Sequence, residues 1–134
     1  MKNTLLMLVV LGMAMAMVSG CGEPSFAQLA DRKFVLMKDM NRTLATVKDA
    51  GSAQRAVPKV ERLVAQLEEL DAQAEQYDGL AEISQMDEGA QKRLLAKLGE
   101  SRAVQDQFDA ELSRIEADPE LSTPLVGVLP GLDD

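Results

Sequence analysis

The chain has 134 residues and carries 22 acidic against 14 basic side chains, a formal charge of −8 at pH 7. This charge repels nucleic-acid phosphates and anionic headgroups. The three Phe, one Tyr and absent Trp leave little aromatic surface for stacking on bases, so we expect no nucleic-acid partner. The absence of His removes the commonest general base, the Ser-His and Cys-His nucleophile pairs and most imidazole metal sites.

The first twenty residues predict an export signal. Lys2 precedes an apolar run over 5–18, and the only cysteine of the chain, Cys21, follows directly after small residues. At a rise of about 1.5 Å per residue this run covers roughly 21 Å, which is short for the roughly 30 Å hydrocarbon core of a membrane. An ordinary secretory peptide with a small-residue cleavage site, or a buried structural Cys21, are the alternatives.

The stretch Val18-Ser19-Gly20-Cys21 resembles the lipobox of bacterial lipoproteins. The resemblance implies that the Cys21 thiol receives a diacylglyceryl group and that the chain is cut just before it. Residues 1–20 would then be the signal peptide and 21–25 a lipidated tether, so that the protein meets a membrane through its anchor at Cys21. Gly22 in place of Asp implies, by the same resemblance, sorting to the outer membrane, facing the periplasm.

Two amphipathic helices are predicted next in chain order. The first starts after Ser25 as N-cap and ends near Ala50-Gly51, and Lys33 stands in one apolar place of its stripe. The second starts either after Ser52 or at Pro58 and ends at Asp78-Gly79. The apolar stripes that define them are Phe26, Ala30, Met37, Met40, Leu44 and Val47, and then Ala56, Val60, Leu63, Leu67, Leu70, Ala74 and Tyr77.

A third helix is predicted to reach about Ala117, with a ragged start over 82–86. Its stripe is Leu94, Leu98, Ser101, Gln105, Phe108, Leu112 and Ile115. Short connections favour an all-α fold in which 26–118 form an antiparallel, up-down-up three-helix bundle. A coiled coil with another chain is the alternative.

The segment 119–134 is apolar for a chain end. Asp118-Pro119 predicts a fresh helix start, and Pro124 and Pro130 limit its length. We expect this segment either to pack across the open end of the bundle or to dock on a partner.

The remaining candidate for chemistry is a row of carboxylates. Glu68 and Glu75 share a helix face and could approach Ca²⁺, but no loop has the order of ligands that wraps calcium. We interpret the row as a solvated charged face, and we expect no metal, no cofactor and no catalytic residue. The row comprises Glu68, Glu69, Asp71, Glu75, Asp78 and Glu82.

Part of the chain after the signal is similar to small helical bacterial lipoproteins of no known activity. The similarity lies in Met40-Asn41, in 44–50, in Ser52-Ala53, Ala56 and Pro58-Lys59, and in 118–121. We therefore expect a non-enzymatic, lipid-anchored envelope protein, an interaction or structural module with a protein partner. A carrier or chaperone that holds an apolar ligand between its helices is the alternative.

Overall fold

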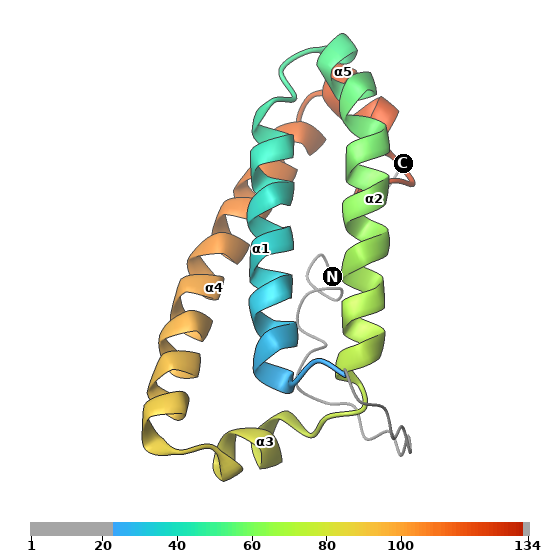
Figure 1. Ribbon diagram of the computed structural model, residues 1–134. Helices are drawn as coiled ribbons and strands as arrows, with labels where there is room; N and C mark the ends of the chain where they lie inside the picture. The colour runs from blue at the N-terminus through green and yellow to red at the C-terminus, as the bar shows by residue number, and fades with distance from the viewer. Residues whose placement is uncertain (1–22, 133–134) are drawn as a thin grey trace.

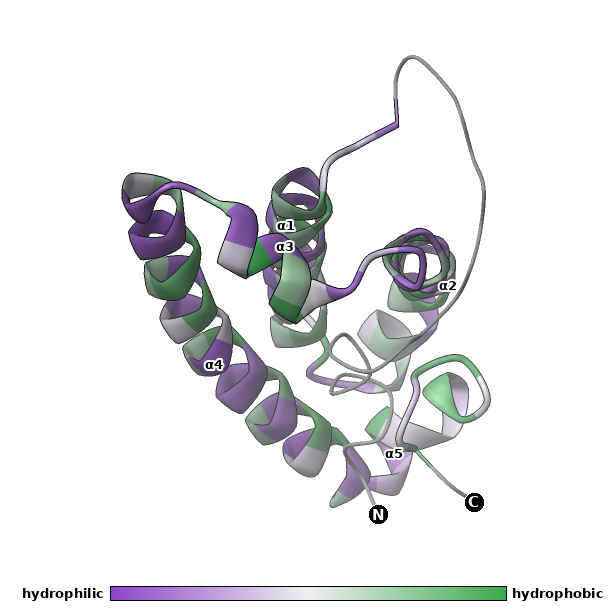
Figure 2. Cartoon of the chain, turned by 90° about the horizontal axis from the view of Figure 1, so that it is seen from below, coloured by the Kyte–Doolittle hydropathy of each residue, from purple (hydrophilic) through white to green (hydrophobic). Residues whose placement is uncertain are grey.

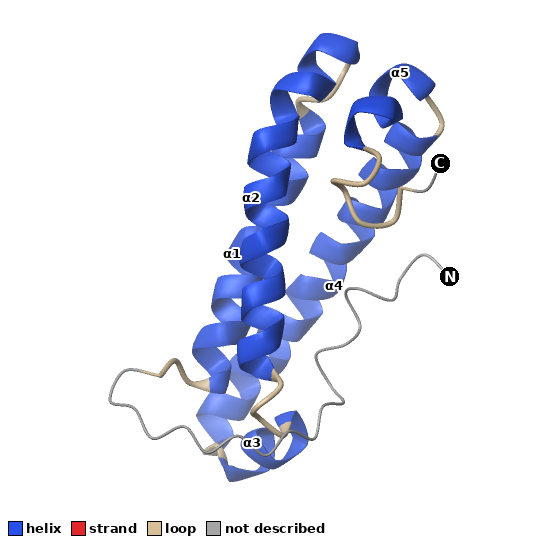
Figure 3. Ribbon diagram, turned by 90° about the vertical axis from the view of Figure 1, so that its right-hand side faces the viewer, coloured by secondary structure: helices blue, strands red, loops and turns tan. Residues whose placement is uncertain are grey.

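The structure, a computed structural model, describes residues 23–132; Cys21 and the expected signal peptide lie outside that range. The chain forms α1 (Phe26–Ala45), α2 (Ala50–Ala74), α3 (Gly79–Gln85), α4 (Glu88–Glu116), α5 (Pro119–Ser122) and a 3-10 turn, η1 (Thr123–Leu125). Within 23–132 there is no strand (Figure 3). The expectation of an all-α chain is confirmed, although the described part divides into more helices than expected.

The three long helices lie side by side, with α1 between α2 and α4 (Figure 1). Along the chain, α1 rises in this view, α2 descends and α4 rises again. α1 packs along both neighbours, whereas α5 and η1 bridge α2 to α4. Seen from the α3 end, α1, α2, α4 and α5 surround a common axis (Figure 2).

The apolar core lies at the end of the molecule where α1 meets α2, which we call the corner end. Met37 and Met40 are buried there, as expected from their place on the stripe of α1. Residues 119–132 also contribute four buried leucines, so this segment packs against the long helices. The buried core side chains are Met37, Met40, Leu44, Val47, Ala53, Ala56, Val60, Leu63, Phe108, Leu112, Ile115, Leu121, Leu125, Leu129 and Leu132.

Polar contacts join the long helices in the other half, towards α3. Lys33, which interrupts the apolar stripe of α1, has a side chain only 16% exposed and pairs with Asp71 of α2 at 2.6 Å. Lys97 of α4 pairs with Asp31 of α1 at 3.0 Å, and its ammonium lies 5.1 Å from the ring centre of Phe34. Lys33 is therefore an interhelical contact rather than a gap in a core.

The junction of α1 and α2 corrects the expected boundary. α1 ends at Ala45, so Gly51 does not close it but lies in the first turn of α2. The cap of α2 is Asp49, whose carboxylate accepts a hydrogen bond from the backbone N–H of Ser52 at 2.7 Å. In return the backbone N–H of Asp49 donates to the Ser52 hydroxyl at 3.0 Å. Ser52 is therefore the third residue of the helix and not its cap.

The structure decides between the two expected starts of α2 and shortens its other end. Pro58 lies inside the helix, which excludes the later start, and the helix ends at Ala74. Asp78-Gly79 does not end α2 but begins α3, because the Asp78 carboxylate accepts from the backbone N–H of Leu80 at 3.1 Å. The irregular start expected for the third helix is this separate helix.

Two leucines on the expected stripes are less buried than predicted. Leu67 is half-buried at the edge of the core. Leu98 is 47% exposed, although Leu94, one turn earlier in α4, is buried. Its polar neighbours are satisfied within α4: Ser101 donates to the carbonyl of Lys97, and Gln105 donates to Asp109.

Candidate functional site

The expected lipid-attachment residue is not described, but the chain just after it is held against the α3 end. The Tyr77 hydroxyl donates a hydrogen bond to the carbonyl of Pro24, and the Phe26 and Tyr77 rings meet edge to face at 6.2 Å. A Cβ at Gly79 would lie 3.2 Å from the Phe26 ring, so glycine permits this close approach. The chain therefore joins α1 beside α3, at the opposite end from the corner.

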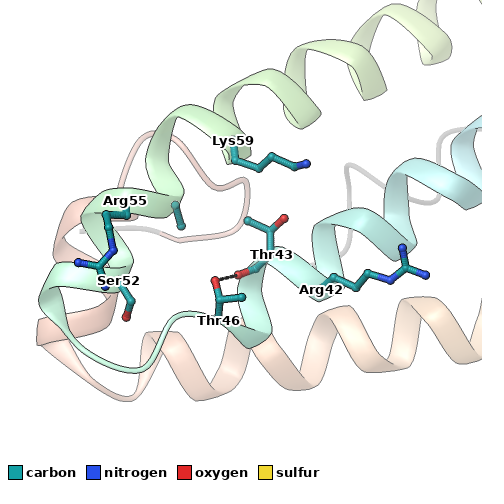
Figure 4. Close-up of a pocket in the computed structure, with 7 residues that line it drawn as sticks. Arg42, Thr43, Thr46, Ser52, Arg55 and Lys59 are labelled. Carbon is teal, nitrogen blue, oxygen red and sulfur yellow. Dashed lines mark hydrogen bonds between the residues drawn. The ribbon is translucent and has the colours of Figure 1, made fainter.

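A pocket of about 440 Å³ lies at the corner end, where α1 folds back onto α2 (Figure 4). Three cationic side chains stand on its rim, Arg42 from α1 and Arg55 and Lys59 from α2. The remaining lining residues are Thr43, Thr46, Ser52 and Ala56. We call the three cations and these four residues the basic pocket.

The cations of the basic pocket are largely free to bind. Arg42 approaches Asp39 at 3.3 Å, but its side chain is 74% exposed, and an exposed pair of this kind contributes little. Neither Arg55 nor Lys59 forms an ion pair with another residue in the part of the chain that the structure describes. Of the three cations, only Arg42 thus forms an ion pair within residues 23–132.

The hydroxyls of the basic pocket are already used by the backbone. Thr43 donates to the carbonyl of Asp39 at 2.8 Å, and Thr46 donates to the carbonyl of Thr43 at 2.6 Å. Ser52 belongs to the cap of α2. Recognition by this pocket must therefore depend on its cations and on its carbon surface.

Asp49 places a carboxylate at the N-terminus of α2, beside the basic pocket. The hydrogen bond from the Ser52 backbone N–H, followed by that from the Ser52 hydroxyl, holds the pKa of Asp49 below its ordinary value of 3.8; Arg55 adds to this. The start of a helix attracts anions because its first N–H groups are unpaired. In α2 the chain's own carboxylate fills that position.

The row of carboxylates near the end of α2 does not assemble a metal site. Asp71 pairs with Lys33, Asp78 caps α3, and Glu69 accepts from Gln73 at 3.4 Å. Across residues 23–132, no three carboxylates or thiols lie close enough together to hold a metal ion. No helix of the described range is long and apolar enough to span a membrane.

A second pocket of about 440 Å³ lies between α1 and α2 on the α3 side of the core. Val35, Leu36 and Leu70 supply its carbon surface, and Asp31, Arg32, Gln66, Glu69 and Gln73 complete its lining. The side-chain oxygen of Gln73 is buried without a hydrogen-bond partner. This pocket is thus more apolar than the basic pocket and holds an unused acceptor.

The basic pocket was not predicted from the sequence. Arg55 and Lys59 are four residues apart on one helix, a spacing that places two side chains on the same face, and this was a detectable signal. Arg42 joins them only because the chain turns back over residues 46–49. No protein family, curated protein or solved structure shows a significant similarity to this chain.

Proposed function

We propose that this protein is a lipid-anchored protein of the bacterial cell envelope whose helical part is a non-enzymatic interaction module. Residues 26–118 would act as an up-down-up three-helix bundle that 119–134 closes at the corner end. Cys21 would carry the lipid, on the outer membrane and facing the periplasm. The lipobox-like stretch before Cys21 supports the anchor, and the basic pocket supports the interaction.

The observation that carries the proposal is the placement of the tether and the basic pocket at opposite ends of α1. The contact between Pro24 and Tyr77 holds the residues just before α1 beside α3. α1 has 20 residues, and at about 1.5 Å per residue it separates the two ends by about 30 Å. A protein anchored at Cys21 would thus present its basic pocket well away from the membrane, where a partner could reach it.

The anchor is tested by replacing Cys21 with Ser in the full chain. We expect the wild-type protein to incorporate labelled palmitate and to fractionate with membranes, and Cys21→Ser to lose the label and remain unprocessed. Two or more acyl chains, at about 0.8 kcal/mol per buried CH₂, hold a protein firmly on a bilayer. Ser19→Ala is the matched control, since it keeps a small residue before Cys21. Normal processing of Cys21→Ser would refute the anchor.

The interaction is tested by chemical crosslinking in intact cells with the anchored protein as bait. We expect a defined set of protein adducts that diminishes when Arg55 and Lys59 are both changed to Glu. The same charge change at Arg62 and Arg102, two exposed residues outside the pocket, should leave the adducts in place. An unchanged set in all variants would contradict a role for the basic pocket.

The second pocket favours one alternative, a carrier for an apolar ligand. Val35 is 56% exposed in that pocket, and the unpartnered Gln73 oxygen could accept a hydrogen bond from a ligand. Gentle extraction followed by native mass spectrometry separates the two functions. A co-purifying lipid or small molecule that is lost in Val35→Glu would support the carrier.

A further inference from the structure

We infer that the basic pocket binds an acidic protein segment, one with carboxylate side chains on both sides of an apolar side chain. The inference deepens the proposed function and rests on it, because it names the chemistry of the partner. Three observations carry it: the charge of the corner, the spread of its cations and the carbon surface between them.

The basic pocket is positively charged in an otherwise acidic protein. Its lining holds three cations and no carboxylate, in a chain whose net charge is −8. Complementary charge steers a partner towards its site and discriminates against the wrong one. An acidic partner would be repelled by most of this molecule and attracted at this corner.

The arrangement of the cations favours an extended ligand over a single compact anion. Arg42 and Arg55 lie on opposite sides of the basic pocket, with Lys59 between them (Figure 4). A phosphate site would need donors that converge on one point, such as the first N–H groups of a helix. In α2 the ionised Asp49 already fills that place, and it would repel a phosphate. Carboxylates spaced along a peptide can instead meet the cations separately.

The surface between the cations offers carbon rather than free donors. Ala56 lines the pocket with a largely buried side chain, and the Thr43 and Thr46 hydroxyls donate back to α1. An apolar side chain can rest there without leaving a polar group unpaired. We therefore expect the pocket to prefer an acidic segment with an apolar side chain over a polyanion that offers charge alone.

The test measures binding of a fluorescein-labelled peptide, Glu-Glu-Leu-Glu-Glu, to the processed protein in a non-ionic detergent. We expect saturable binding that weakens between about 0.1 M and 1 M salt, where the screening length falls from about 10 Å to about 3 Å. The double variant Arg55→Glu, Lys59→Glu should weaken binding by about tenfold or more, since it turns two attractions into repulsions. The double variant Arg62→Glu, Arg102→Glu, with the same charge change at two exposed residues outside the pocket, is the matched control and should change the affinity by less than about threefold.

Two further peptides and two competing anions decide the chemistry. The peptide with Gln in place of each Glu should not bind, and the peptide with Ser in place of Leu should bind more weakly. Inorganic phosphate and polyphosphate should compete poorly. The inference would be overturned if inorganic phosphate displaced the labelled peptide as well as unlabelled peptide does. It would also be overturned if the double variant Arg55→Glu, Lys59→Glu bound the peptide as tightly as the wild type. Loss of adducts in cells from the double variant, together with no peptide binding, would leave the interaction module standing and refute only the acidic partner.

Discussion

Arg114 joins the last turn of α4 to the end of α1. Its guanidinium donates to the carbonyl of Leu44 at 2.9 Å and to that of Val47 at 2.8 Å, while Glu111 pairs with it at 2.7 Å. The last carbonyls of a helix have no partner within the helix, and its C-terminus attracts positive charge. One side chain thus adds a charged donor just at and beyond the end of α1 and joins that end to α4.

Replacing Arg114 with Ala should lower the free energy of unfolding by about 1–3 kcal/mol, because two carbonyls lose a charged donor. Arg114→Lys should recover only part of this, since an ammonium cannot reproduce the two-pronged contact. Arg102→Ala, an exposed change on the same helix, should stay within about 0.5 kcal/mol. Urea unfolding of the three variants measures the differences. Equal losses of stability in Arg114→Ala and Arg102→Ala would refute the role of Arg114 in joining α4 to the end of α1.

The cap at Asp49 should make stability depend on pH. Because the pKa of Asp49 is lowered in the folded chain, its contribution is complete above the ordinary value of 3.8 and is lost as the pH falls through the folded value. Asn can cap a helix without titrating. We therefore expect the melting temperature of the wild type to fall more steeply than that of Asp49→Asn below about pH 4. If the melting temperatures of the two proteins fell in parallel with pH, protonation of Asp49 would not contribute to the loss of stability.

At the scale of whole helices, the periodic apolar residues predicted most of the structure. α1, α2 and α4 follow their stripes because a repeat of three and four places one face of a helix against its neighbours. The junction over residues 46–49 was missed because Val47 continues the spacing of α1 and is buried, although it lies outside the helix. The cap at Asp49 was missed because its partner in the first turn is a Ser, whereas the usual capping box has Glu or Gln there.

The two leucines in the middle of α2 should differ in their effect on stability. Leu63 is 3% exposed within the core, whereas Leu67 is half-buried at its edge. Leu63→Ala should cost about 2–5 kcal/mol, as for large-to-small changes in a core, and Leu67→Ala should cost less. Chemical denaturation of both variants provides the comparison. A greater loss at Leu67 would mean that the rotation of α2 about its axis is wrong.

The C-terminal segment should be part of the folded core. Leu125 is fully buried, and the turn after it depends on Gly127, whose φ of 78° suits glycine. Leu125→Ala should cost about 2–5 kcal/mol, and Leu80→Ala, at a site that is 70% exposed, should have little effect. Thermal melting compares the two. A stable Leu125→Ala protein would instead favour a segment that serves only to dock a partner.

At the scale of the whole molecule, the fold divides the chain into an apolar corner end and a polar α3 end. The sequence carries this division only indirectly, since the polar contacts, such as that between Lys33 and Asp71, join residues far apart in the chain. The basic pocket arises in the same way from two helices that meet at the corner. Net charge alone indicated an acidic protein and concealed a basic surface.

The central claim is that a protein anchored at Cys21 meets its partner through the basic pocket. Position-specific photo-crosslinking in living cells tests it most directly, with a photoreactive residue at Thr46 on the pocket or at Gln85 on α3. We expect an ultraviolet-dependent protein adduct from Thr46, absent from Gln85 and lost when Arg55 and Lys59 are changed to Glu. An adduct of equal strength from Gln85, or one from Thr46 that survives the charge reversal, would contradict the claim.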